Sequence, residues 1–181
     1  MIGIVIVAIV MAIGAPSYKT WIHNTKIRNA TESVVNGLQL ARAQAVSRNT
    51  PVQFDLRTGS GGASWTVCQQ PAGGGRCPDP DNATTIQSYF SNEGAASAIV
   101  VAPKLADGTD GGTTIVFNNF GRVVPVLAPL PLAFAQLNVD ISNAVLTAAE
   151  SRDLRITIGV GGNARMCDPD PGLSGTDPRK C

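Results

Sequence analysis

The hydrophobic pattern begins with fifteen residues that carry no charge and no hydrogen-bonding side chain. As a helix, this segment would be about 22 Å long. That is slightly short for a bilayer core, which takes about 20 apolar residues to cross. A segment that is apolar on every side suits lipid or contact with other apolar helices. Its branched side chains are those of Ile2, Ile4, Val5, Ile6, Val7, Ile9, Val10 and Ile13.

Helical periodicity continues after this segment. Pro16 predicts a kink and not an end, because the helical pattern resumes at once. Between residues 21 and 47 one face carries Ile27, Ala30, Val34, Leu38, Ala41 and Ala45, and Gly37 is a mild weak point. The breaker cluster at 49–51 ends the helix near Arg48. We therefore expect one helix of nearly fifty residues, apolar over 1–15 and amphipathic over 16–50.

From residue 51 the chain alternates short β-prone runs with turns rich in glycine and proline. We expect an antiparallel β domain of about 8–9 short strands over residues 51–181, with the amphipathic helix packed on it, in an α+β fold. Turns are expected at 58–62, 118–121 and 159–163. The strands are expected at 52–56, 64–69, 86–90, 98–102, 113–118, 122–126, 136–141, 153–160 and 164–167.

Charge is unevenly spread although the net charge is only +1. From Lys19 to Thr50 five basic residues face one acidic residue, Glu32, which gives a local charge of +4. The balance of the whole chain excludes a general polyanion-binding protein. The four cysteines fall into two close pairs, Cys68 with Cys77 and Cys167 with Cys181. Neither pair has the spacing of a zinc or redox site, so two local disulfides in an oxidising compartment are favoured over four buried thiols.

The sequence contains no recognisable catalytic motif. The single histidine, His23, has no neighbouring cysteine or carboxylate cluster at ligand spacing. Asp79 and Asp81 are carboxylates in a proline-rich loop that lacks the calcium-loop pattern. We therefore expect no enzyme, no metal and no cofactor. An ordinary signal segment, cleaved near Ala15 to release a periplasmic binding domain, is the alternative to an anchor that stays attached.

Four stretches carry a resemblance that covers essentially the whole chain. They are ARAQAVSRNTPV (41–52), WTVC (65–68), IVFNNFGRV (115–123) and GNARMCDP (162–169). Together with the long helix, they resemble the type IV pilin-like proteins of the pseudopilin H and FimT/FimU family. The resemblance implies a minor subunit of a type IV pilus or of a type II secretion pseudopilus, which acts in filament priming and assembly.

The resemblance also implies a location and partners. The family implies a single-pass inner-membrane precursor with a periplasmic C-terminal domain, cleaved by a prepilin peptidase and methylated at its new N-terminus. The mature chain then leaves the lipid and joins other pilins in a filament, with residues 1–15 in the filament core. The leader glycine and the following glutamate that the family carries do not appear before Met1. We therefore hypothesise that the sequence is truncated or begins at an internal methionine.

A second departure concerns DNA. Some FimT-type members bind DNA for natural transformation through a C-terminal G-R-x-R motif, and this chain has Gly162-Asn163-Ala164-Arg165 at that place. Only the second arginine is kept, which weakens phosphate binding. A Cys167–Cys181 disulfide would bring Arg179 and Lys180 near Arg165 as candidate DNA-binding residues. A solvated hairpin end is the simpler interpretation, and the sequence favours it.

Overall fold

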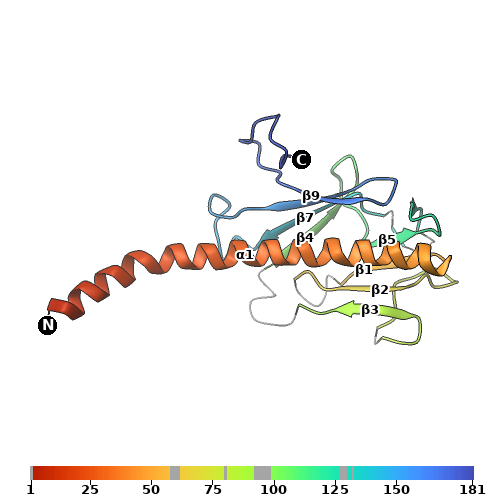
Figure 1. The fold of residues 1–181 in the computed structure, drawn as a ribbon, viewed down its shortest axis with the longest axis horizontal. Coiled ribbons are helices and arrows are strands. Elements are labelled where there is room, and N and C mark those ends of the chain that lie inside the picture. The colour runs from red at the N-terminus through yellow and green to blue at the C-terminus, as the bar shows by residue number, and fades with distance from the viewer. Residues whose placement is uncertain (1, 58–61, 80, 92–98, 127–129, 132) are drawn as a thin grey trace.

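The computed structural model describes residues 2–57, 62–79, 81–91, 99–126, 130–131 and 133–181, with only the backbone for Ile2 and residues 4–17. Within these residues the chain forms one long helix and two antiparallel sheets (Figure 1). The helix, α1 (Ile2–Arg48), continues through Pro16 without a break, and its N-terminal part curves away from the β domain. This continuity confirms the expected single helix. The placing of the kink at Pro16, and the division at residues 15 and 50, stay predictions.

The buried face of α1 follows a repeat of three and four residues, at Ile27, Thr31, Val34, Leu38, Ala41 and Ala45. One member differs from the predicted set. Thr31 is fully buried in place of Ala30, which is only partly covered. The Thr31 hydroxyl donates to the Ile27 carbonyl at 2.7 Å, and this bond removes the cost of burying a polar group. The pattern of apolar positions did not predict the burial of Thr31, because it takes no account of a hydroxyl that donates to a carbonyl of its own helix.

The helix ends where the breaker cluster predicts. Asn49 adopts a left-handed conformation with φ of 53°. Its backbone N–H donates to the Val46 carbonyl, and the Thr50 N–H donates to the Ala45 carbonyl, both at 3.3 Å. These two bonds form a Schellman motif, which satisfies carbonyls that the last helical turn leaves free. Pro51 then directs the chain into the first strand.

All nine expected strands form, with small shifts at their ends. The prediction at 122–126 was too long, because β6 stops before Pro125, which has no N–H to donate to a ladder. The turn at 58–61 and Ala98 lie outside the described residues. The strands are β1 (Val52–Leu56), β2 (Trp65–Gln69), β3 (Thr85–Tyr89), β4 (Ile99–Lys104), β5 (Thr114–Phe117), β6 (Val123–Val124), β7 (Gln136–Ile141), β8 (Leu154–Ile158) and β9 (Ala164–Cys167).

Two sheets share the helix. The first has the strand order β3-β2-β1-β5-β6 and the second has the order β4-β7-β8-β9. In Figure 1, β1, β2 and β3 lie on one side of α1 and β4, β7 and β9 lie on the other. Buried side chains from α1 and both sheets form one core. The expected α+β fold is therefore confirmed, with the refinement that the strands divide into two sheets.

Gly37 lets α1 approach the first sheet closely. A Cβ at this position would lie 2.8 Å from Phe54 Cε2 and 2.8 Å from Trp65 Cε2, both too close for a real contact. The Trp65 indole also donates to the Ser33 hydroxyl at 3.1 Å. Gly37 is therefore a packing requirement and not the weak point that helix propensity suggests.

Both expected disulfides form, Cys68–Cys77 and Cys167–Cys181. The first ties the segment after β2 to that strand. The second holds the C-terminal tail against the end of β9, where Asp168 forms a parallel bridge with Lys180. Each disulfide closes a short loop and removes chain entropy from the unfolded state.

Candidate functional site

The N-terminal part of α1 projects beyond the β domain (Figure 1). The buried helical positions begin at Ile27, and Tyr18 and Trp21 before it are 63% and 64% exposed. Their rings stack with centroids 6.1 Å apart. The helix therefore has a part that the β domain covers and a part that projects beyond it.

Asn24 marks the boundary between these parts. Its side-chain amide donates to the Glu150 carbonyl at 3.1 Å and accepts from the Arg152 N–H at 2.9 Å. A single amide thus binds two backbone groups of the loop before β8 and fixes the β domain to the helix at this level. Arg28 and Arg152 line a groove of about 410 Å³ next to Asn24, which Cys167 and Arg179 also line.

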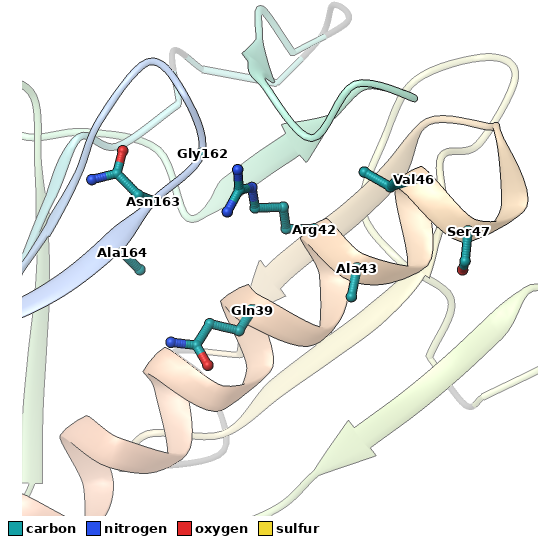
Figure 2. A pocket seen from close by; sticks show the side chains of 8 residues that line it. All are labelled: Gln39, Arg42, Ala43, Val46, Ser47, Gly162, Asn163 and Ala164. Atoms are coloured by element: carbon teal, nitrogen blue, oxygen red, sulfur yellow. The ribbon is translucent and has the colours of Figure 1, made fainter.

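A second groove lies near the other end of the helix, between α1 and the β8–β9 hairpin (Figure 2). It encloses about 520 Å³, and Gln39, Arg42 and Val46 face Gly162 and Asn163 across it. The Arg42 Nε donates to the Gly121 carbonyl at 3.1 Å, so this arginine connects the helix to the β5–β6 turn. The neighbouring turns expose Phe120 and Val160.

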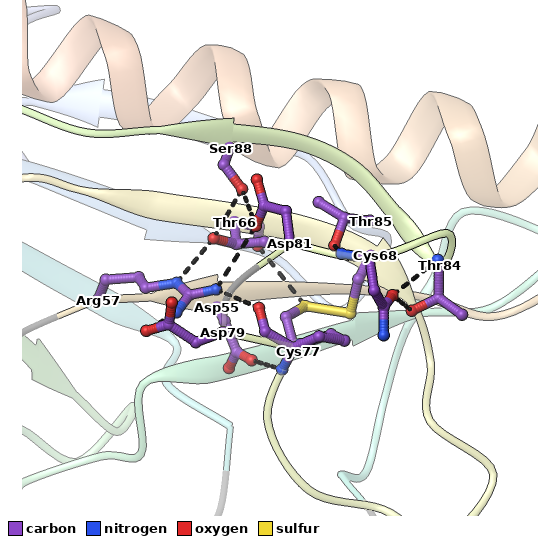
Figure 3. Close-up of polar contacts among 12 residues, drawn as sticks. Asp55, Arg57, Thr66, Cys68, Cys77, Asp79, Asp81, Thr84, Thr85 and Ser88 are labelled. Atoms are coloured by element: carbon purple, nitrogen blue, oxygen red, sulfur yellow. Dashed lines mark hydrogen bonds and ion pairs between the residues drawn. A yellow bond between two sulfur atoms is a disulfide. The ribbon is translucent and has the colours of Figure 1, made fainter.

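A buried polar cluster lies beneath the first disulfide (Figure 3). Asp55 of β1 accepts from the Cys77 N–H and the Thr114 hydroxyl, and it is 1% exposed. Two residues later, the Arg57 Nε donates to the Thr66 hydroxyl at 2.8 Å, and its guanidinium pairs with Asp79. The cluster fastens the loop after β2 to the outer face of the first sheet.

The carboxylates of Asp79 and Asp81, both in the loop after β2, therefore pair with the Arg57 guanidinium. Asp81 lies 3.9 Å from the Arg57 Nη2 and also accepts from the Ser88 hydroxyl at 2.8 Å. Over the described ranges, no group of three or more His, Cys, Asp or Glu side chains could hold a metal ion. The Nδ1 of His23 is buried without a hydrogen-bond partner among the same residues. The alternation in β1 could have identified Asp55 and Arg57 as one polar face, but not their burial.

The three candidate DNA-binding residues lie on neighbouring segments, but their charges are partly occupied. The Arg165 Nη2 is 3.4 Å from the Lys180 carbonyl. Arg179 forms an ion pair with Asp177 at 2.8 Å, and the Lys180 ammonium donates to the Leu173 carbonyl at 2.7 Å. The hydrogen bonds from Arg179 lower the pKa of Asp177 to about 2, so its negative charge stays on this surface at neutral pH. DNA binding at this end stays a prediction of the sequence.

Similarity to known families decides the identity of the chain. Residues 30–162, which run from the covered part of α1 to the β8–β9 turn, match the family model described as "Type II transport protein GspH". The chain belongs to the GspH family. It is thus a minor pilin or pseudopilin subunit of a type IV pilus or type II secretion system, as the sequence resemblance implied. This is a family of structural subunits.

Solved structures are similar to this chain. The minor pseudopilin EpsH from the type 2 secretion system of Vibrio cholerae is similar over 80% of this chain and 98% of its own, with a TM-score of 0.50 and 14% identity. The type IV minor pilin FimU of Pseudomonas aeruginosa also matches, with TM-scores of 0.44 and 0.45 in two crystal forms and 16% identity. These matches cover 77% and 81% of this chain and 90% of FimU. No curated protein sequence matches the chain.

Across the part of α1 and the other segments that the structure describes, no helix is long and apolar enough to span a bilayer. The GspH family indicates a periplasmic filament as the place of the assembled subunit.

Proposed function

We propose that this GspH-family subunit is held in the inner membrane by the apolar part of α1 and then moves into the core of a periplasmic filament. One observation carries the proposal: among the α1 side chains that the structure describes, the fully buried ones begin at Ile27, and the helix projects from the β domain before Asn24. An apolar helix outside its own domain needs lipid or neighbouring apolar helices around it. The two environments correspond to the two stages.

Processing and partners follow from the same proposal. A prepilin peptidase acts on the full-length precursor, and other pilins or pseudopilins supply the helices that surround the apolar segment in the filament. The β domain forms the outer surface. Keeping the apolar surface out of water is favourable by roughly 25 cal/mol for each Å² in either environment, whereas the exchange of lipid contacts for helix contacts depends on side-chain packing. After this cleavage, the subunit itself acts by assembly into the filament.

Photo-crosslinking in the native host tests this proposal. A photo-reactive amino acid replaces Ile6 in the apolar segment or, as the control, Val100, whose side chain is exposed on β4. With the assembly machinery active, we expect Ile6 to form adducts with other pilins in the sheared filament fraction. Without it, we expect adducts with lipid or none. Identical pilin adducts in both strains, or pilin adducts from Val100 alone, would contradict the proposal.

A further inference from the structure

The aromatic pair Tyr18 and Trp21 has no place in the β domain. Both side chains are exposed, and they stack on one side of the projecting helix, three residues apart. Large aromatic side chains in water represent an unfavourable exposure of apolar surface unless another surface covers them. Their polar tips, a hydroxyl and an indole N–H, require that this surface be partly hydrated.

Their position along the helix selects the surface. Tyr18 follows the uncharged segment 1–15 by less than one helical turn, and Lys19 beside it is the first charged residue of the chain. At 1.5 Å per residue, the pair occupies about 4.5 Å along the helix axis. The headgroup region of one bilayer leaflet is about 5–8 Å thick. Tyr and Trp are enriched at this level in membrane proteins, with their rings among the headgroups.

The charges on the same part of the molecule favour anionic headgroups. Lys19, Lys26 and Arg28 precede the first acidic residue, Glu32. Arg28 pairs with Glu32 at 2.8 Å, but Arg152, which lines the adjoining groove, forms no ion pair within the described parts of the chain. Asn24 fixes this arginine's loop to the helix only about 4.5 Å beyond Trp21. Arg152 thus lies close to the aromatic pair along the helix, in the same loop as Glu150 and in a groove that Asp168 also lines.

We infer that Tyr18 and Trp21 form an interfacial anchor that sets the depth of the membrane-held subunit, with Lys19 and Arg152 directed at anionic lipid headgroups. The inference rests on the membrane stage of the proposed function and adds to it the level at which the helix leaves the lipid. The anchor holds the β domain directly on the membrane surface, with no free linker between them. Extraction into a filament would then remove two aromatic rings from the interface.

Depth-dependent fluorescence quenching tests the anchor in the full chain. The chain has two tryptophans. Trp21 is exposed, whereas Trp65 is 4% exposed and packs against Phe54 and Tyr89, so Trp65 is an internal reference. The chain is reconstituted in vesicles of phosphatidylethanolamine and phosphatidylglycerol, with bromine placed either near the glycerol end or near the methyl end of the acyl chains. Wild type is compared with Trp21→Phe.

We expect shallow bromine to quench wild type about twofold more than deep bromine, and this difference to disappear in Trp21→Phe. Equal quenching of the two proteins, or stronger quenching by deep bromine, would overturn the inference. If the Trp21 emission wavelength changed with protein concentration and not with lipid concentration, the inference would be overturned in favour of a contact between subunits. Because no other pilin is present, these results do not depend on filament assembly.

Vesicle flotation tests the charge component and separates the two proposals. Lys19→Glu should weaken binding to phosphatidylglycerol vesicles about tenfold to thirtyfold, whereas Arg48→Glu, the same change at the far end of α1, should not. Equal effects of both variants would overturn the role of Lys19. A chain that does not float at all would reject both the anchor and the membrane stage. A chain that floats without shallow quenching would reject the anchor alone.

Discussion

Gly162 packs directly against the backbone of Gly121. A Cβ on Gly162 would lie 2.0 Å from the Gly121 carbonyl oxygen, and the φ of Gly162 is +78°. Steric exclusion and backbone conformation therefore both require glycine here. Through this contact the β8–β9 hairpin of the second sheet touches the β5–β6 turn of the first, beside the groove that Arg42 borders.

We predict that Gly162→Ala lowers the free energy of unfolding by about 2–4 kcal/mol. The new Cβ would overlap the Gly121 carbonyl oxygen, and alanine is strained in the left-handed conformation that residue 162 adopts. Gly161→Ala is the matched control. A Cβ there meets only the Asn163 Oδ1 at 3.7 Å, an ordinary contact. Urea titration of both variants measures the difference. Equal losses would show that the Gly121 contact is not responsible.

Arg57 should stabilise the loop after β2 more than a surface ion pair would. Arg57→Met removes the donors to Thr66 and to the Pro78 carbonyl and leaves Asp79 without its cation. We expect a loss of about 1–3 kcal/mol and faster proteolysis between β2 and β3. Lys104→Met, which breaks the exposed Lys104–Asp110 pair, should cost less than about 1 kcal/mol. A similar cost for both variants would contradict this role of the cluster.

The two disulfides should differ in their accessibility to reductant. Cys68 and Cys77 are both buried, whereas Cys181 is exposed. We therefore expect a thiol reductant to open Cys167–Cys181 first in the folded protein, as alkylation and mass spectrometry would detect. Replacing either pair with serine should cost about 3 kcal/mol, since the closed loops are of similar length. Simultaneous reduction of both would indicate global unfolding as the route.

Asp153 should make stability depend on pH. Burial, followed by the neighbouring Asp140, raises the pKa of the Asp153 carboxyl above its ordinary value of 3.8. The Ser151 hydroxyl contacts both carboxylates, at 2.9 Å and 2.6 Å, and Asp168 adds further negative charge. A raised carboxyl pKa means that folding becomes less favourable as the pH rises from about 3.8 through the folded-state value, and the loss is complete above it. Asp153→Asn should therefore raise the melting temperature at pH 7, and the gain should fade toward about pH 3.8.

Asp107 is the control for this pH dependence, because its shift has the opposite sign. Hydrogen bonds from Thr109 lower the pKa of Asp107. Its contribution to stability is present above pH 3.8 and disappears as the pH falls through the lowered value. Asp107→Asn should thus lower the melting temperature at neutral pH. A higher melting temperature in both Asp153→Asn and Asp107→Asn would show that the loss of a negative charge in general, and not the proximity of Asp140, is responsible.

The sequence predicted the elements of this fold better than their packing. The alternation in β1 and the breaker cluster at 49–51 defined the elements, because both depend on local conformation. Long-range steric contacts could not be predicted in the same way. Gly37 resembled a weak helical position until Phe54 and Trp65 were found against it, and no local pattern indicated that the disulfide loop covers Arg57.

The sharing of one helix by two sheets has a mechanical consequence. β1 and β2 of one sheet and β7 to β9 of the other all contact α1, and in Figure 1 β1, β2 and β9 run broadly along it. A pull along the helix axis therefore loads both contact surfaces in shear, so that many side-chain contacts must break together. A filament subunit built in this way can transmit tension from its helix to its outer domain without peeling open.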